Sequence, residues 1–419
     1  MTTASQHKRP STGRMTVPLP PEFTERDTGP FDPPSVLGRL GSQGPVHRVT
    51  MLDGDPMWLV TDHELARTLF ADPRLGSDRF GSKRVLDKLP EQVRARMTDA
   101  RARAGSFITM DPPRHTRYRR LLTGQFTVRR MKQLTPRIER IVTEHLDAMI
   151  AAGPGADLVR AFALPVPSLV ICELLGVEYG DRGEFQERTA MLLRLDVPVE
   201  EVMRLADELR AFMRGLVLSK RAEPTDDMLS GLIEADPTLT DDELIGIANL
   251  LLVAGHETTA NMLALGTFAL LEHPDQLAAL RNDPTLIGGA VEELLRYLSI
   301  VHLGVVRTTR EEVEIAGEVV PADSTVLLSV PAANRDPRQY DKPDALDVTR
   351  PRGAHLAFGH GVHQCLGQQL ARVEMTVGFT ELLRRLPGLR LDVPAADVPM
   401  RGDMLIYGVH ALPVTWDEA

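Results

Sequence analysis

Cysteine is nearly absent from this chain of 419 residues, which contains only Cys172 and Cys365. Two cysteines cannot build a disulfide framework, so the sequence favours a reducing compartment over secretion. A signal peptide is also lacking, because the first twenty residues are polar, charged and interrupted by prolines. No segment has the roughly twenty consecutive apolar residues that a membrane-spanning helix needs. These absences predict a cytoplasmic protein without a membrane segment.

Lysine and aromatic residues are scarce as well. Only six of the 48 basic residues are lysines, and 58 Asp and Glu residues outnumber them all, which gives a net charge of −10. Nucleic-acid binding draws much of its affinity from a basic surface, so this charge argues against it. The aromatic content of 5% argues against a site built to stack flat rings. The remaining composition, 43% hydrophobic and 25% charged, is typical of a globular protein.

The hydrophobic pattern predicts a mainly α protein with small β regions. Residues 1–20 lack periodicity and are expected to form a flexible arm. Residues 21–419 show no repeat and no linker, which predicts a single domain. Apolar residues at helical spacing predict helices over 63–70, 114–122, 135–152, 165–175, 199–220, 226–234, 275–282 and 365–386. Strands are expected over 46–49, 57–61, 313–315, 319–320 and 325–329, with a turn at 53–55.

The clearest predicted element is a helix over residues 240–273. It opens with a threonine followed three residues later by a glutamate, Thr240 and Glu243, which is the pattern of a capping box, and Pro274 ends it. At about 1.5 Å per residue the helix would extend ~50 Å. Its middle is apolar on every side, so we expect it to be buried.

The stretch over residues 355–372, HLAFGHGVHQCLGQQLAR, places Cys365 among three glycines just before a helical run. Glycine lets a backbone approach a flat cofactor or adopt positive φ, and a helix N-terminus lowers the pKa of a thiol. Cys365 would therefore be a good thiolate ligand. Two other interpretations of the residues are open: a buried cysteine that acts as a small hydrophobe, or a zinc site formed by His355, His360, His363 and Cys365.

The spacing Phe358-x-x-Gly361-x-x-x-Cys365-x-Gly367 resembles the haem-binding signature of the cytochrome P450 family. The runs AGHETTAN and GVHQCLGQQLAR are similar to the soluble actinobacterial members. The resemblance implies that family's fold, with a long central helix over a haem and the cysteine loop on the opposite side. It also implies that the cofactor is haem b, that Cys365 ligates its iron, and that Phe358, Gly359 and Gly367 contact it. Thiolate ligation favours O–O bond cleavage, so the expected protein activates oxygen.

The middle of the long helix reads AGHETT over residues 254–259. An acid and threonines inside an apolar helix are costly unless they are partnered, and a threonine can bond back to the preceding turn. A satisfied buried kink is the interpretation from these residues alone. The resemblance implies an oxygen-activating helix in which the Thr258 hydroxyl and the Glu257 acid deliver protons. It leaves the role of His256 open.

Glu293 and Arg296 lie three residues apart on one helical face. Such pairs are common on solvated helices, where they contribute only a few tenths of a kcal/mol. In the family the pair is buried and, with an arginine from a later loop, supports the region behind the cysteine. The matching arginine is Arg350, in the loop over residues 340–350. Tyr340 and Leu346 stand there in place of the usual phenylalanines, and we interpret them as packing changes.

The segment over residues 111–120, DPPRHTRYRR, is rich in arginine. A solvated basic face is one interpretation. His115 and Arg119, however, are four residues apart and share a face suited to gripping a carboxylate. The resemblance implies that they contact the haem propionates together with Arg307 and His363. The other cations nearby are expected to dock an acidic ferredoxin; they are Arg114, Arg117, Arg120, Arg129, Arg130 and Lys132.

The resemblance implies a monooxygenase that hydroxylates or epoxidises a bulky apolar molecule, such as a macrolide, steroid, terpenoid or xenobiotic, in secondary metabolism, antibiotic biosynthesis or xenobiotic oxidation. Electrons would come from a ferredoxin and an NAD(P)H-dependent ferredoxin reductase, expected as separate proteins because 419 residues accommodate the haem domain alone. The alternatives are a haem-thiolate peroxygenase, isomerase or sensor, and a zinc protein. The substrate pocket is expected among the segments 75–107 and 191–197 and six aliphatic residues. These are Leu250, Val253, Ala254, Leu303, Leu405 and Ile406.

Overall fold

The computed structural model describes residues 19–177 and 191–417. The expected N-terminal arm, residues 1–20, lies outside the described residues except for its last two, of which Leu19 is buried. Within the described ranges, no helix is both long enough and apolar enough to cross a membrane.

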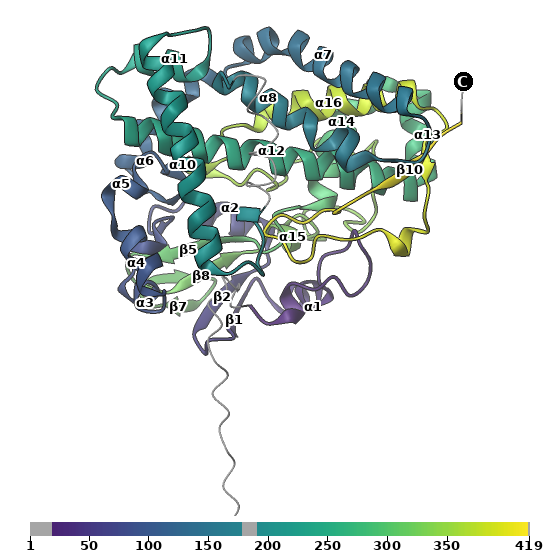
Figure 1. The fold of residues 1–419 in the computed structure, drawn as a ribbon. Helices are drawn as coiled ribbons and strands as arrows, with labels where there is room; N and C mark the ends of the chain where they lie inside the picture. The colour runs from purple at the N-terminus through teal and green to yellow at the C-terminus, as the bar shows by residue number, and fades with distance from the viewer. Residues whose placement is uncertain (1–18, 178–190, 418–419) are drawn as a thin grey trace, which may run out of the picture.

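One long helix, α12 (Asp241–Glu272), crosses the middle of the molecule (Figure 1). Its capping box forms as predicted: the Glu243 N–H donates to Thr240 Oγ1 at 3.2 Å, and the Thr240 N–H donates to Glu243 Oε2 at 2.8 Å. Four α-helices make its most extensive contacts with other α-helices. They are α8 (Pro165–Leu175), α10 (Val199–Ala222), α14 (Ile287–Leu298) and α16 (Gln368–Arg385).

The other helices surround this bundle or connect it to the sheets. The longest is α7 (Val128–Ala152), which packs on α8 and α16. The shorter ones are α1 (Ser35–Gln43), α2 (His63–Ala71), α3 (Lys83–Asp87), α4 (Glu91–Thr98), α5 (Ala100–Arg103), α6 (Arg114–Thr123), α11 (Met228–Ala235), α13 (Pro274–Asn282) and α15 (Val330–Ala333).

The main sheet lies below α12 in Figure 1 and has the strand order β1-β2-β8-β5-β3. Its β2–β8 pair is parallel and the other pairs are antiparallel. The predicted hairpin forms between β1 and β2, and Gly54 in its turn has φ +85°. The strands of this sheet are β1 (Val46–Thr50), β2 (Pro56–Val60), β3 (Leu75–Gly76), β5 (Val305–Thr309) and β8 (Thr325–Leu328).

Two small sheets complete the β structure. One has the order β4-β10-β9 and the other is the β6–β7 hairpin. Their strands are β4 (Ala156–Asp157), β6 (Val313–Ile315), β7 (Glu318–Val320), β9 (Arg390–Leu391) and β10 (Pro413–Thr415). The fold is therefore mainly α with small β regions, as the sequence predicts.

The sequence analysis missed the start of one helix. The helix expected over 135–152 begins at Val128, where Thr127 caps it by accepting the Arg130 N–H. Pro136, which resembles a helix start in the sequence, lies inside this helix. The first turn is held by Met131, whose side chain is buried, so packing and a cap outweigh the local cost of the proline.

The segment 75–107, expected as a loop, contains the three short helices α3, α4 and α5. Ser82 caps α3 by accepting the Val85 N–H, and Asp99 caps α5. Val93 is the one buried residue of these three helices. Because so little of this segment is apolar and buried, it has almost no hydrophobic periodicity for a sequence-based prediction to detect.

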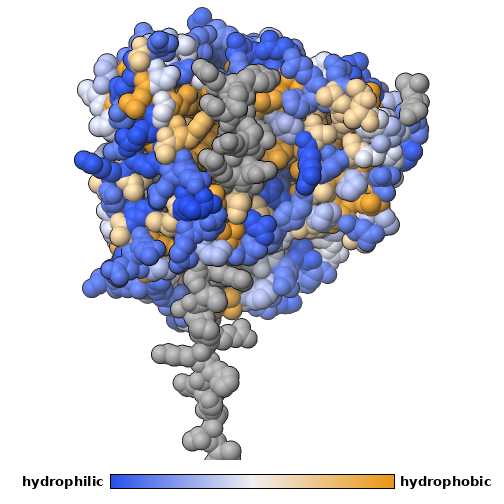
Figure 2. All heavy atoms as spheres, viewed as in Figure 1, coloured by the Kyte–Doolittle hydropathy of each residue, from blue (hydrophilic) through white to orange (hydrophobic). Residues whose placement is uncertain are grey.

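The face drawn in Figure 2 is mostly hydrophilic, with small separate hydrophobic areas. Across the described residues, the large apolar side chains that are exposed are well separated in the sequence. They are Leu52, Ile108, Val128, Leu218, Val319 and Val362.

Candidate active site

The middle of α12 has one open face. Most of the helix is buried, as predicted, but Leu250, Ala254 and Thr258 are not fully covered, and Ala254 is exposed. These residues are four positions apart and therefore share a face. Thr258 Oγ1 donates to the Ala254 carbonyl at 2.8 Å, so its hydroxyl is satisfied within the helix and its oxygen can still accept a hydrogen bond.

Glu257 is completely buried in a cluster of polar side chains. Its Oε2 lies 2.9 Å from Nη2 of Arg401, and its Oε1 lies 3.5 Å from Nε2 of His256. Asn261 Nδ2 donates to the Glu257 carbonyl at 2.7 Å and lies 3.3 Å from Oε2. Burial alone would raise the pKa of Glu257, but the contacts with His256 and Arg401 outweigh it and lower the pKa below the usual value. The cluster therefore holds a buried carboxylate.

The cysteine loop is fixed by backbone contacts. Cys365 follows η8 (Gly361–His363), and its N–H donates to the Phe358 carbonyl at 2.9 Å. Gly361 has φ +73°, and a Cβ there would lie 2.7 Å from the Phe70 carbonyl oxygen. A side chain would therefore push the loop away from α2, which explains the glycine at this position.

Burial raises the pKa of the Cys365 thiol, although the backbone N–H groups of Gly367 and Gln368 and the charges of Arg119 and Arg372 lower it. The net direction is opposite to the one predicted from a helix N-terminus. The reason is that α16 begins only at Gln368 and that burial outweighs the amides. A cation bonded to the sulfur would be needed to favour the thiolate fully.

Basic side chains without acidic partners gather beside this loop. The rings of His115 and His363 lie 4.1 Å apart between centroids. Arg119 donates to the Gln364 carbonyl at 2.6 Å, and Arg307 donates to a backbone carbonyl. Within the described ranges, none of these four contacts a carboxylate, and both ring nitrogens of His115 and Nε2 of His363 lack a hydrogen-bond partner.

Burial strongly lowers the pKa values of two members of this basic cluster. Burial lowers the pKa of Arg307 to about 10. Burial, helped by the charges of His115 and Arg307, lowers the pKa of His363 to about 3. Buried basic groups without counter-ions are the complement of an anionic ligand, and two carboxylates such as haem propionates would satisfy them.

A haem fits the remaining features of this region, whereas zinc does not. A Cβ on Gly367 would meet no heavy atom within 4 Å, so the backbone next to Cys365 can accept a flat group. For zinc, His355 bonds Glu292 instead of facing Cys365, and no three His, Cys, Asp or Glu side chains of the described chain converge on a metal position. The zinc interpretation is therefore wrong. Fold and site together define a haem-thiolate protein.

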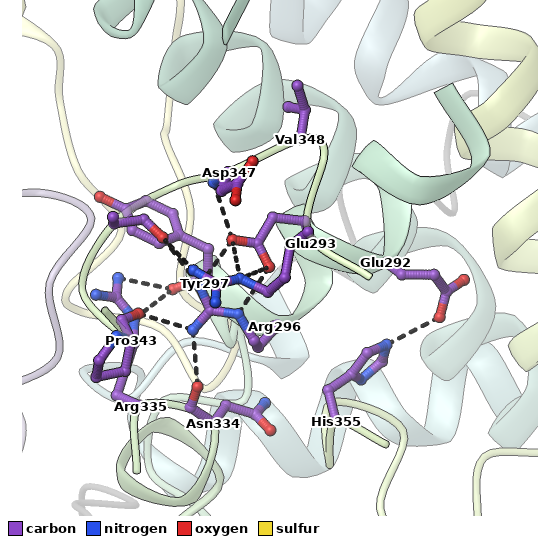
Figure 3. A network of polar contacts seen from close by, with 12 residues as sticks. Glu292, Glu293, Arg296, Tyr297, Asn334, Arg335, Pro343, Asp347, Val348 and His355 are labelled. Carbon is purple, nitrogen blue, oxygen red and sulfur yellow. Dashed lines mark hydrogen bonds and ion pairs between the residues drawn. The ribbon is translucent and has the colours of Figure 1, made fainter. Parts of the chain in front are cut away.

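The Glu293–Arg296 pair is buried (Figure 3). Arg350 joins it. Arg296 donates from Nε and Nη2 to the two carboxylate oxygens of Glu293 at 2.7 and 2.8 Å. Arg350 Nε lies 3.1 Å from both oxygens. Arg296 also donates to three carbonyls of the segment 334–345, so one side chain ties α14 to that loop. Tyr340 and Leu346 are both buried, in keeping with their interpretation as packing residues.

Another polar cluster on α14, which the sequence analysis did not predict, joins this helix to the residues on either side of the cysteine loop. Glu292 lies beside Glu293, and it accepts a hydrogen bond from His355 Nε2 at 3.0 Å (Figure 3). It also accepts one from Arg372 Nε at 2.6 Å. The Arg372 guanidinium lies 4.6 Å from the centre of the Phe358 ring. Burial opposes ionisation of Glu292, but His355 and Arg372 outweigh it and lower its pKa to about 2.

Two of the six cations assigned to a docking patch are already paired. Arg117 contacts Asp236 and Glu243, and Arg130 contacts Asp226. The other four are exposed. They are Arg114, Arg120, Arg129 and Lys132.

One segment assigned to the substrate pocket, 191–197, meets the C-terminal turn. The Leu405 N–H donates to the Leu193 carbonyl at 2.9 Å, and Arg194 pairs with Met404 through a backbone bridge. Leu303, Leu405, Ile406 and Val253 are all partly buried. Arg401, also in this turn, was missed because a single arginine in a C-terminal segment carries no signal until the fold brings it to Glu257.

The comparisons with known proteins agree with this class. The family model for cytochrome P450 matches residues 199–400. Over 402 residues the chain is 50% identical to cytochrome P450 105C1 of a Streptomyces species, an alignment that covers 96% of this chain and 100% of that protein. The crystal structure of Rif16 is 57% identical, with a TM-score of 0.83 over 95% of this chain and 100% of that one. CYP105P1 in complex with filipin I is 42% identical, with a TM-score of 0.87 over 97% and 100%.

The chain belongs to the cytochrome P450 family. It is a haem-thiolate monooxygenase of the actinobacterial type that uses O2 and redox partners and binds small molecules.

Proposed function

We propose that this enzyme hydroxylates or epoxidises a bulky, weakly polar small molecule in the bacterial cytoplasm, with electrons from a ferredoxin and its NAD(P)H-dependent reductase. The single observation that carries the site assignment is the basic cluster without counter-ions beside Cys365. His115, Arg119, Arg307 and His363 hold the propionates. Cys365 ligates the iron, and Phe358, Gly359 and Gly367 surround it.

The bound haem supplies the activation of dioxygen, which its thiolate ligand favours. The chain supplies protons, orientation and exclusion of water. Thr258, on the open face of α12, offers its hydroxyl oxygen as an acceptor while its proton is held by the Ala254 carbonyl. Glu257, one residue earlier, is the buried carboxylate that carries protons toward this face.

The proposed class of substrate follows from the residues that line the expected substrate pocket. Leu250, Val253 and Ala254 on α12 and Leu303, Leu405 and Ile406 offer aliphatic surface without charge, so shape and apolar contact select the molecule. The complex of the related CYP105P1 with filipin I supports a large ligand. Four exposed cations at residues 114–132 support a docking surface for an acidic ferredoxin. The chain has only two cysteines, too few for a disulfide framework, which supports a reducing compartment.

The first experiment is an absorption spectrum of the dithionite-reduced protein with carbon monoxide. We expect a strongly red-shifted Soret band that is lost in Cys365→Ala and kept in Cys172→Ala, because Cys172 lies in α8 and not beside the basic cluster. A band of the histidine-ligated type in the unmodified protein would overturn the assignment of Cys365. Substrates are then found by the spin-state shift that they cause.

A peroxygenase, isomerase or sensor, the alternative that the sequence left open, would form no product that depends on NAD(P)H and redox partners. Product formation with surrogate ferredoxin and reductase therefore tests the proposed source of electrons.

A further inference from the structure

Arg401 reaches the centre of the molecule from the C-terminal turn over residues 400–409. The ends of this turn are joined by a Met400–Val409 bridge, and the Arg401 N–H donates to the Gly408 carbonyl at 2.9 Å. A Cβ on Gly408 would overlap the side-chain amide of Asn261. The turn therefore packs so closely on α12 that the Arg401 side chain is 7% exposed.

The Arg401 guanidinium has two partners on α12. Its Nη2 lies 2.9 Å from Glu257 Oε2, and its Nη1 donates to Asn261 Oδ1 at 3.3 Å. Asn261 in turn contacts the same carboxylate from its Nδ2. Arginine and asparagine thus contact the same oxygen of Glu257 and also contact each other.

The charged and titratable groups that face Glu257 are Arg401 from the turn and His256 from α12 itself. His256 Nδ1 lies 3.3 Å from the Leu252 carbonyl oxygen, and its Nε2 lies 3.5 Å from Glu257 Oε1. The histidine contact is the longer of the two contacts to the carboxylate. Arginine side chains carry a fixed positive charge, whereas a histidine is charged only when protonated.

We propose that Arg401 is the positioning residue of Glu257: it keeps this side chain ionised and turned toward the C-terminal turn, so that the carboxylate can accept and pass on protons. The inference rests on the proposed proton-carrying role of Glu257. The C-terminal turn that carries Arg401 also carries Leu405 and Ile406, so one turn of the chain both holds Glu257 and lines the proposed substrate site.

The test is isotope-edited infrared spectroscopy of the haem-loaded protein at neutral pH, with Glu257→Gln used to identify the Glu257 bands. The unmodified protein should show carboxylate bands for Glu257. Arg401→Met should replace them with the C=O band of a neutral acid, because burial then acts without the charge of Arg401 and the His256 contact alone remains. Arg401→Lys should restore the carboxylate. Retention of the carboxylate in Arg401→Met would overturn the inference.

A matched control is Arg390→Met, which removes another arginine of the C-terminal region that pairs with Asp417 at the surface. It should leave the Glu257 bands unchanged. If Arg401→Met is too unstable for spectroscopy, the double variant Glu257→Gln, Arg401→Met decides the matter through its melting temperature. It removes both charges together and should melt at a higher temperature than Arg401→Met alone. An equal or lower melting temperature would contradict a compensating role for Arg401.

Turnover separates this inference from the function on which it rests. In Arg401→Met, product formed per NAD(P)H should fall by about tenfold or more, as expected when an acid–base group is lost, and Arg401→Lys should recover most of it. If Glu257→Gln keeps full coupling, the proton-carrying role fails. The infrared result then still decides whether Arg401 holds the carboxylate.

Discussion

Thr258 and Thr267 occupy the same helix and make the same bond. Each donates its hydroxyl to the carbonyl four residues earlier at 2.8 Å. Thr267 is completely enclosed by the core, whereas Thr258 lies on the open face beside Ala254. The hydrogen bond itself does not distinguish them, because it is identical in both and only the surroundings differ.

This pair allows a controlled test of the hydroxyl. We expect Thr258→Ala to lower the product formed per NAD(P)H by about tenfold or more, with the reducing equivalents released as peroxide. The measurement compares product, peroxide and NAD(P)H consumed with surrogate redox partners. Thr267→Ala loses the same bond and should couple as the unmodified enzyme does. Equal coupling in both variants would show that the Thr258 hydroxyl delivers no proton.

At the scale of elements, the same pair of residues is buried in one helix and not in another, so its contribution to stability differs. Glu293–Arg296 on α14 and Glu381–Arg384 on α16 are both glutamate–arginine pairs three residues apart. The first is buried and shared with Arg350, whereas in the second Arg384 is exposed and Glu381 is partly exposed. A buried carboxylate that loses its charge leaves two arginines without a counter-ion.

We therefore expect Glu293→Gln to lower the free energy of unfolding by about 3–5 kcal/mol and to weaken haem retention. Glu381→Gln should change neither quantity measurably, because solvent already screens this pair. Urea unfolding followed by circular dichroism and by Soret absorbance measures both. A similar small effect of the two substitutions would mean that the buried network is not needed for stability.

Element boundaries show where sequence patterns suffice. The capping box predicted the start of α12 because both partners lie within three residues of each other. The predicted start of α7 was wrong, because the true start depends on the burial of Met131 against residues far away in the sequence. Helices α3, α4 and α5 were missed because a segment with little buried apolar surface has no periodicity to detect.

At the scale of the whole molecule, the net charge of −10 conceals a local excess of positive charge over residues 114–132. Folding changes this excess, since Arg117 and Arg130 pair with acids from distant segments. The docking proposal therefore rests on the four cations that remain exposed.

We expect Arg120→Glu to raise the KM for ferredoxin several-fold while kcat at saturating ferredoxin changes little, because the substitution acts on encounter and not on chemistry. The effect should shrink as salt is added. The control is Arg48→Glu on β1, in a different part of the molecule (Figure 1). Reduction kinetics at several ionic strengths provide the measurement. An equal response of both variants would place the docking surface elsewhere.

The sequence by itself determined the class of this protein, because the cysteine signature, the AGHETT run and the Glu293–Arg296 pair are local patterns whose spacing survives any arrangement of the rest. Only the tertiary structure decided how the acid at the centre of α12 is compensated. Glu257 and Arg401 are separated by more than a hundred residues, and a lone arginine acquires meaning only when the fold brings it within 2.9 Å of a buried carboxylate. Burial and pairing of charges depend on which distant segments meet, and that is a property of the packed chain.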